Sequence, residues 1–273
     1  MSLAVNAEDY SADAFLGGRV SILQPKRGHH RSGLEAVLLA AALPVGLEGV
    51  IVDLGAGAGV AGLCAASLRP AASVVLVERE AALVAVARTT LARAENAALA
   101  ERVAIAEVDV AAPEAARIAA GIPRGEAAAV LTNPPFHDNR SVRVSPAAAR
   151  AAAHVLPDGL EPWFRTAASA LRPQGLLVAV TLASAVAEAL DVLGRRFGDV
   201  VLLPIHPRAE EPAHRLLLGA RKGRRGSPTI LPGLVLHDGP GNAFAPNVEA
   251  ILRGVADLSE AHPPWRHAVG GAI

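Results

Sequence analysis

The feature that most constrains the fold of this chain is the alternation, from residue 50 onward, of short apolar runs with alanine- and leucine-rich stretches. The apolar runs predict strands at residues 50–54, 73–78, 102–109, 128–133, 176–182, 199–205 and 214–221. The stretches between them predict helices near residues 58–69, 80–96, 161–171 and 183–197. Because strands that are apolar along their whole length must be covered on both faces, this order predicts a mostly parallel sheet between helices. We therefore expect an α/β chain with one doubly wound, seven-stranded sheet in a single domain.

Two regions lie outside this alternation and flank it. We divide the chain into an N-terminal segment at residues 1–48, the alternating domain at residues 49–225 and a C-terminal extension at residues 226–273. Apolar residues make up 52% of the chain and charged residues 19%, which indicates a globular protein. The first residues include acids and lack the apolar core of a signal peptide, and no apolar run is long enough to span a membrane. We expect a soluble, cytoplasmic protein with no membrane partner.

The chain offers few residues for disulfide or metal chemistry. Its single cysteine, Cys64, lies in the apolar stretch AGLCAASL, which predicts a buried side chain and excludes a cysteine-based zinc site. His29 and His30 are adjacent and have no further metal ligand at a useful spacing. We therefore expect no bound metal.

A glycine-rich loop follows the first predicted strand. In VDLGAGAGVAG, Asp53 stands at the end of the strand, and Gly55, Gly57 and Gly59 precede the next helix. Glycine lets the backbone turn tightly and lets a ligand approach without a Cβ in the way, and the helix N-terminus behind it offers free N–H groups. In an open parallel sheet, ligands bind in the crevice at the carboxyl ends of the strands. A plain tight turn is the less favoured alternative.

The spacing of the loop fits two cofactors. Gly57, Gly59 and Gly62 satisfy the dinucleotide pattern, and Glu78 ends the second strand, where a ribose-binding acid belongs. Nicotinamide cofactors and S-adenosyl-L-methionine (SAM) both present a ribose diol to such an acid. Asp53 favours SAM in part, because an acid before the first glycine would repel a pyrophosphate but suits an ammonium and a sulfonium.

Two further residues stand at strand ends and allow more than one interpretation. Asp109 ends the third strand and could accept a hydrogen bond from the adenine amino group of the cofactor, or it could be a solvated strand end. Trp163 lies in the helical stretch EPWFRTAASAL, and we expect it in the core rather than as a platform for a base.

The fourth strand ends in Asn133-Pro134-Pro135-Phe136, beside the same crevice. Proline cannot donate to a sheet, so the strand must stop here, and both prolines lock φ. An exocyclic amine is a poor nucleophile, and a pair of acceptors can orient its N–H groups and stabilise the developing positive charge. Asn133 supplies a side-chain carbonyl, Pro134 a backbone carbonyl, and Phe136 a ring that can stack on a planar target. A turn that only terminates the strand is the alternative.

The glycine loop, Glu78, Asp109 and the NPPF tetrapeptide, in this order, resemble the class I SAM-dependent methyltransferases of Rossmann-like fold that modify exocyclic amino or amide nitrogens. The segment SILQPKRGHHRSGLEAVLLAAALP at residues 21–44 further resembles the small-domain family of bacterial tRNA (adenine-N6)-methyltransferases. That resemblance implies an N-terminal segment over the cofactor, with Gly33, Glu35, Leu38 and Leu39 at the matching positions. Glu35 stands where aspartate is usual.

The resemblance implies SAM as the cofactor and a set of residues that bind it. The cofactor-binding set is Arg31, Gly33, Asp53, Gly55, Ala56, Gly57, Gly59, Glu78, Asp109, Val110 and Asn133. The catalytic set is Asn133, Pro134, Pro135 and Phe136.

The target of methylation has several candidates. We expect adenine N6 of tRNA, while the string NPPFHD is close to ribosomal RNA guanine-N2 enzymes, which carry a duplicated N-terminal domain that this chain has no room for. A protein glutamine amide is a further target, and a nicotinamide-dependent oxidoreductase is the alternative of another class. His137 and Asp138 either position the target or cap the loop.

The charge pattern leaves room for an RNA partner. The chain holds 26 basic and 26 acidic residues, so only local patches could hold a polyanion. The two basic clusters are Lys26, Arg27 and Arg31, and Arg221, Lys222, Arg224 and Arg225. We expect them to neutralise RNA phosphates on either side of the crevice, with solvated loops as the alternative.

Overall fold

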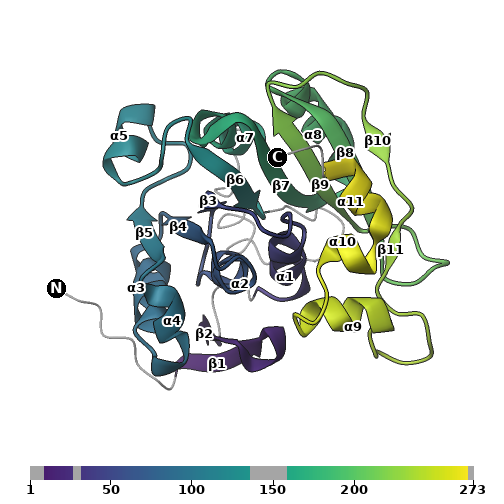
Figure 1. Cartoon of the computed structure of the whole chain (residues 1–273), viewed down its shortest axis with the longest axis horizontal. Coiled ribbons are helices and arrows are strands. Elements are labelled where there is room, and N and C mark those ends of the chain that lie inside the picture. The colour runs from purple at the N-terminus through teal and green to yellow at the C-terminus, as the bar shows by residue number, and fades with distance from the viewer. Residues whose placement is uncertain (1–8, 27–31, 136–158, 270–273) are drawn as a thin grey trace, which may run out of the picture.

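A computed structural model of the 273-residue chain describes residues 9–26, 32–135 and 159–269. All seven predicted strands are present and belong to one sheet (Figure 1). They are β3 (Gly49–Leu54), β4 (Ala72–Glu78), β5 (Val103–Glu107), β6 (Ala127–Thr132), β7 (Leu171–Leu182), β8 (Phe197–His206) and β9 (Arg215–Lys222). Two short strands, β10 (Thr229–Ile230) and β11 (Leu234–Val235), add to the free side of β8. The Rossmann-like α/β fold is therefore as predicted, and these two-residue strands extend the sheet beyond the prediction.

The order of the strands places the crevice. From one side to the other the sheet runs β10-β8-β9-β7-β6-β3-β4-β5, and β9 alone is antiparallel to its neighbours. The chain proceeds outward from β3 to β4 and β5, and then returns to β6 on the other side of β3. Such a reversal opens a crevice between adjacent loops at the carboxyl ends of the strands. We call this edge, where β3, β4, β5 and β6 end, the carboxyl edge.

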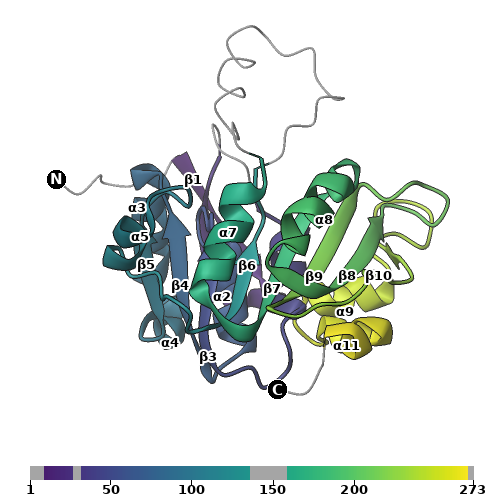
Figure 2. The same cartoon turned by 90° about the horizontal axis from the view of Figure 1, so that it is seen from above.

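Helices cover both faces of the sheet (Figure 2). Side chains of α1 (Leu34–Ala41), α2 (Val60–Leu68), α3 (Ala81–Leu91) and α4 (Ala97–Ala100) share one buried cluster with alternate residues of the strands, such as Ile51. Side chains of α7 (Glu161–Ala170) and α8 (Val186–Gly194) share the other with the intervening residues, such as Val52. The helix α5 (Glu114–Ala119) lies at the β5 end of the sheet (Figure 1).

The hairpin of β1 (Tyr10–Phe15) and β2 (Val20–Pro25) packs against the α3 side, with the 3-10 turn Leu16–Gly18 between its strands. The β1–β2 hairpin also explains why the helix predicted for residues 80–96 ends early, at Leu91. The amide of Asn96, in the 3-10 turn Ala94–Asn96, donates to the carbonyls of Ser21 and Thr90 and accepts from the Ser21 N–H. A continuous helix would not bring Asn96 back to this strand, so the contact with the hairpin breaks the helix.

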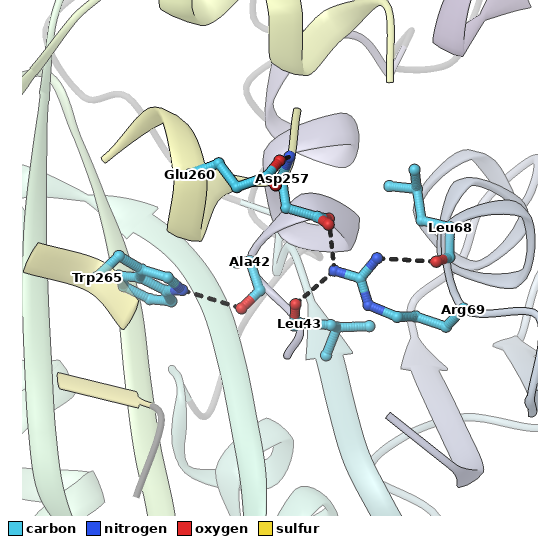
Figure 3. A network of polar contacts seen from close by, with 7 residues as sticks. All are labelled: Ala42, Leu43, Leu68, Arg69, Asp257, Glu260 and Trp265. Atoms are coloured by element: carbon cyan, nitrogen blue, oxygen red, sulfur yellow. Dashed lines mark hydrogen bonds and ion pairs between the residues drawn. The ribbon is translucent and has the colours of Figure 1, made fainter. Parts of the chain in front are cut away.

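The C-terminal helices α9 (Pro246–Leu252), α10 (Leu258–Ala261) and α11 (Pro263–Val269) lie beside α1 (Figure 1). Figure 3 shows two of the polar contacts that join them to the rest of the chain. The indole N–H of Trp265 donates to the carbonyl of Ala42 at 2.9 Å. The Arg69 guanidinium pairs with Asp257 at 2.7 Å and also donates to the carbonyls of Leu43 and Leu68.

A further 3-10 turn, Ala183–Ala185, joins β7 to α8. In the described part of the chain, no helix is long and apolar enough to cross a membrane.

Candidate functional site

The strand order brings the predicted site residues into one row along the carboxyl edge. Asp109 follows β5, Glu78 ends β4, Gly55 follows β3 and Asn133 follows β6. The row therefore reads Asp109, Glu78, Gly55, Asn133 across four neighbouring parallel strands. Gly55 and Asn133, which are 78 positions apart in the sequence, become neighbours because the ends of parallel strands meet at one edge.

The glycine loop takes a conformation that other residues rarely adopt. Gly55, Gly57 and Gly59 have φ angles of +72°, +58° and +91°, and the N–H groups of Gly55 and Ala56 both donate to the Val77 carbonyl at 2.9 Å. A Cβ at Gly57 would meet nothing within 4 Å, so the backbone faces open space there. This is the position at which a ligand could approach the main chain.

The Glu78 carboxylate anchors this loop. It is 8% exposed, and its Oε2 accepts from the Gly57 N–H at 2.9 Å, while its Oε1 accepts from the N–H groups of Arg79 and Glu80 at 2.7 and 2.9 Å. Because an ionised carboxylate offers about four lone-pair sites, Glu78 retains acceptor capacity beside the loop. Carboxylate oxygens that can accept further hydrogen bonds, beside accessible backbone, suit the hydroxyl groups of a ribose, because these hydroxyl groups donate hydrogen bonds.

Asp53 is turned away from the crevice into the helix that follows the loop. Its Oδ2 accepts from the Gly62 N–H at 2.8 Å, and the side chain is 2% exposed. A Cβ on Gly62 would overlap the Leu76 side chain and lie 3.1 Å from this oxygen, so packing alone requires the glycine. Burial raises the pKa of Asp53 to about 7, the Gly62 hydrogen bond opposes the rise and the charge of Glu78 adds to it. Asp53 therefore supports the loop through its hydrogen bond with the Gly62 N–H in α2. Because its side chain is buried, it presents no exposed charge to a ligand.

This raised pKa predicts a pH-dependent stability. The folded protein keeps the Asp53 proton up to about pH 7, whereas the unfolded chain releases it near pH 3.8, so the favourable contribution is lost as the pH rises between these values. We expect the unfolding free energy of wild type minus that of Asp53→Asn to fall over this window by at most about 1.4 kcal/mol per pH unit. Urea unfolding from pH 4.5 to pH 8 measures it. A flat difference would contradict the prediction, and Asp191→Asn, in an exposed pair with Arg195, is the control expected to be flat.

Cys64 is fully buried in α2, as predicted. Burial and the nearby Asp53 carboxylate raise the pKa of its thiol. A thiol with a raised pKa is a poor nucleophile, so Cys64 serves packing.

Asp109 lies in the turn after β5 and is half exposed. Its Oδ1 accepts from the Ala111 N–H at 2.7 Å, and its Oδ2 accepts from the Arg79 guanidinium at 3.1 Å. The Val110 carbonyl accepts from the Thr166 hydroxyl at 2.8 Å, which ties this turn to α7. The structure thus shows Asp109 in a solvated turn at the end of the row of site residues, and its contact with the adenine amino group stays a prediction.

The Asn133-Pro134-Pro135 segment follows directly after Thr132, the last residue of β6. The buried Thr132 hydroxyl donates to the Leu54 carbonyl at 3.1 Å, which joins the end of β6 to the end of β3. Asn133 is half-buried, Pro134 is buried and Pro135 is exposed. Phe136, His137 and Asp138 lie outside the described residues.

A buried glutamine that the sequence did not single out positions the N-terminal segment. Gln24, in β2, accepts from the Ser32 N–H at 2.9 Å and donates to the Ser32 carbonyl at 3.1 Å and to Asp13 at 2.7 Å. This pairing places the start of α1, where Gly33 is the residue before the first turn and has open space around it. In the sequence VSILQP, Gln24 follows Val20 and Ile22 at every second position, and this alternation was a signal that a polar residue shares the apolar face of a strand. Arg31 lies outside the described residues.

Glu35, which stands where the family has aspartate, forms an ion pair with Arg215 at 3.7 Å. Arg215 begins β9, and because that strand runs antiparallel, its first residue lies on the carboxyl-edge side of the sheet. Leu38 and Leu39 are fully buried and belong to the core. Arg215 was not predicted, because nothing in the local sequence shows which strand end α1 meets.

Trp163 packs on the core with part of its ring, as predicted, but it also contacts the glycine loop. A Cβ on Gly55 would lie 2.7 Å from two atoms of the six-membered ring of Trp163, Cζ3 and Cη2. The sequence contained a signal that Trp163 is not fully buried in the core. Trp163 and Phe164 are consecutive residues in a helix and point about 100° apart, so they cannot both be fully buried in the same core. Phe164 takes the core position.

The two basic clusters do not flank one crevice. Arg221 pairs in register with Leu176 of β7, which itself pairs with Ala129 of β6, so the end of β9 points toward the edge of the sheet opposite Asn133. Arg221 donates to the carbonyls of Gln174 and Val269, and Lys222 to that of Leu171. The expected arrangement of Arg221–Arg225 is therefore wrong, because β9 is antiparallel. Of the other cluster, the structure describes Lys26 alone.

No group of three or more His, Cys, Asp or Glu side chains that could hold a metal occurs within residues 9–26, 32–135 and 159–269.

Comparisons with known proteins point to one family. A family model described as "Methyltransferase small domain" matches residues 34–206. A solved structure of a predicted O-methyltransferase from Agrobacterium tumefaciens is 34% identical, covers 81% of this chain and 96% of its own, and has a TM-score of 0.70. TYW2 from Pyrococcus horikoshii, solved in complex with MeSAdo, is 12% identical, covers 80% of this chain and 72% of its own, and shares the fold at a TM-score of 0.51. No curated protein matches the chain significantly.

Proposed function

Since this chain belongs to the methyltransferase small domain family and its cofactor is SAM, we propose that it methylates an exocyclic amino nitrogen, namely adenine N6 of tRNA. The observation that carries the proposal is the placement of Asn133. This residue follows β6 at the carboxyl edge, directly across from Gly55 of the glycine loop, because Leu54 and Thr132 are paired in register. The acceptor group of Asn133 and the cofactor loop therefore meet at one point of the edge.

The residues along the row fit the successive parts of SAM. Asp109 suits the adenine amino group, Glu78 suits the ribose hydroxyls, and the open backbone at Gly57 lets the cofactor approach the loop. When bound, SAM supplies a methyl group on a sulfonium, which is a strongly activated leaving group. Glu78 ends β4 and Asn133 follows β6, the strands on either side of β3, so the residues that would hold the ribose and meet the methyl group flank the glycine loop.

The chain's own contribution is to orient the target amine. The side-chain carbonyl of Asn133 and the backbone carbonyl of Pro134 accept hydrogen bonds from its two N–H groups and stabilise the positive charge that develops on nitrogen. The prolines keep these acceptors in place, which removes the cost of ordering them during the reaction. A hydroxyl target would need a base to take its proton, whereas both of these groups are carbonyls. They therefore favour nitrogen over the oxygen target that the name of the Agrobacterium tumefaciens protein states.

Transfer of labelled methyl from SAM to RNA tests this function. We expect the purified protein to label unmodified tRNA, and nucleoside analysis by mass spectrometry to identify N6-methyladenosine. N2-methylguanosine in ribosomal RNA would support the related enzyme class in place of this one. Methylglutamine in protein, or a 2′-O-methylated nucleoside, would overturn the proposal.

We also propose that RNA contacts the carboxyl edge through the cluster of Lys26, Arg27 and Arg31, which falls in the sequence between the hydrogen-bonded residues Gln24 and Ser32. The cluster at Arg221–Arg225 would reach phosphates only across the sheet, roughly 20 Å away at about 3.3 Å per residue of strand. The salt dependence of tRNA binding tests this. Charge removal at Lys26 and Arg27 should reduce the slope of log K against log salt by about 2, and removal at Arg224 and Arg225 should reduce it less.

A further inference from the structure

The tryptophan beside the glycine loop lies in a rigid part of the fold. Trp163 is in the first turn of α7, which starts at the carboxyl edge (Figure 2). Both carboxylate oxygens of Glu161 accept from Arg196, at 2.5 and 3.1 Å, and the Leu160 N–H donates to Glu188 at 2.8 Å. Together with the buried Phe164, these contacts hold the start of the helix. The indole of Trp163 is therefore positioned before any ligand binds.

The contact partner of this indole identifies the part of the cofactor that comes near it. Trp163 touches Gly55, which follows β3, whereas Glu78 and Asp109 end the strands on one side of β3 and Asn133 ends the strand on the other. In SAM the sulfonium lies between the ribose and the methyl group that is transferred. With the ribose at Glu78 and the methyl group directed to Asn133, the sulfonium comes over the end of β3. Among the described residues, Trp163 is the aromatic side chain that meets the loop at Gly55.

We propose that Trp163 contacts the cofactor at its sulfonium and favours SAM over the neutral product S-adenosylhomocysteine by a cation–π interaction. Indole has the strongest quadrupole of the natural aromatic side chains, and a cation held near its face gains about 0.5–2 kcal/mol. Methyl transfer removes the positive charge from sulfur, so the interaction is lost in the product complex. Trp163 would thus bind the substrate form of the cofactor selectively and weaken the product. The inference rests on the cofactor placement proposed above and is independent of the methyl acceptor.

Calorimetric titration of SAM and of S-adenosylhomocysteine into wild type, Trp163→Leu and Trp163→Phe tests the proposal. In Trp163→Leu we expect the ratio of the Kd of S-adenosylhomocysteine to that of SAM to fall about two- to thirtyfold, and in Trp163→Phe to fall less. An equal loss of affinity for both ligands would show packing alone and overturn the proposal, as would unchanged affinities. Thermal unfolding checks that each variant folds.

Tryptophan fluorescence provides a second readout, since Trp265 is the only other tryptophan. Trp265 is 0% exposed and its indole N–H is bonded to Ala42, so we expect its emission not to respond to the cofactor. SAM should change the emission of wild type, and Trp163→Phe should lose most of that change while calorimetry still detects binding. If Trp163→Phe keeps the full change, Trp163 is not at the cofactor and the proposal fails.

The variant Glu78→Gln separates this inference from its premise. The ribose is common to both ligands, so Glu78→Gln should weaken SAM and S-adenosylhomocysteine by the same factor. If it weakens neither, the cofactor placement is wrong, and the inference falls with it. If Glu78→Gln behaves as expected while Trp163→Leu loses both ligands equally, only the role of Trp163 is overturned.

Discussion

Replacing Asn133 with alanine is expected to lower the rate of methyl transfer by about 10²–10³-fold, the usual effect of removing one preorganised group that stabilises developing charge. The side chain stands at the junction of β6 and β3, on the same edge as the glycine loop. Alanine removes the carbonyl that orients the target amine, but it keeps the backbone and Pro134. The loss should therefore appear in kcat more than in the affinity for the cofactor.

Calorimetry and single-turnover transfer measure these two effects separately. SAM should bind Asn133→Ala within about twofold of wild type, since one contact at the edge of the cofactor site contributes little. Asn247→Ala is the matched control, because Asn247 is exposed on α9 and its amide oxygen accepts from the N–H of its own neighbour, Val248. Turnover of Asn133→Ala at the wild-type rate would refute the catalytic role of this residue.

Replacing Arg69 with methionine is expected to cost roughly 3 kcal/mol of unfolding free energy. The Arg69 side chain is 2% exposed and that of its partner Asp257 is 18% exposed, so water screens this pair poorly (Figure 3). The guanidinium also donates to the carbonyls of Leu43 and Leu68, at the ends of α1 and α2. Methionine fills similar volume and leaves a carboxylate and two carbonyls without this donor. Such loss of a buried partner costs more than the intact pair contributes.

Urea unfolding of Arg69→Met measures this cost, with Arg88→Ala as the control. Arg88 pairs with Glu107 at 3.4 Å, but both side chains are exposed, so its loss should cost less than about 1 kcal/mol. Limited proteolysis should also release the C-terminal helices of Arg69→Met faster than those of wild type. If the two variants unfold at the same urea concentration, apolar contacts rather than the ion pair hold α10 and α11 in place.

Much of the fold could be predicted because it depends on local patterns. The seven main strands are recognisable as apolar runs, and the glycines at 55, 57 and 59 as a loop with positive φ. The break after Leu91 could not be predicted in this way. The residues that follow are good helix formers, and it is the contact of Asn96 with the β1–β2 hairpin that ends the helix there.

By itself, the sequence determined the class of fold and the residues along the carboxyl edge, because periodicity and strand-ending residues are properties of neighbouring positions. Only the tertiary structure decided how those residues are used. It buried Asp53 beneath the loop, placed Trp163 against Gly55 and, by reversing β9, moved Arg221 to the far edge. The physical reason is the same in each case. Strand direction and helix docking depend on contacts between residues distant in sequence, and no local pattern encodes them.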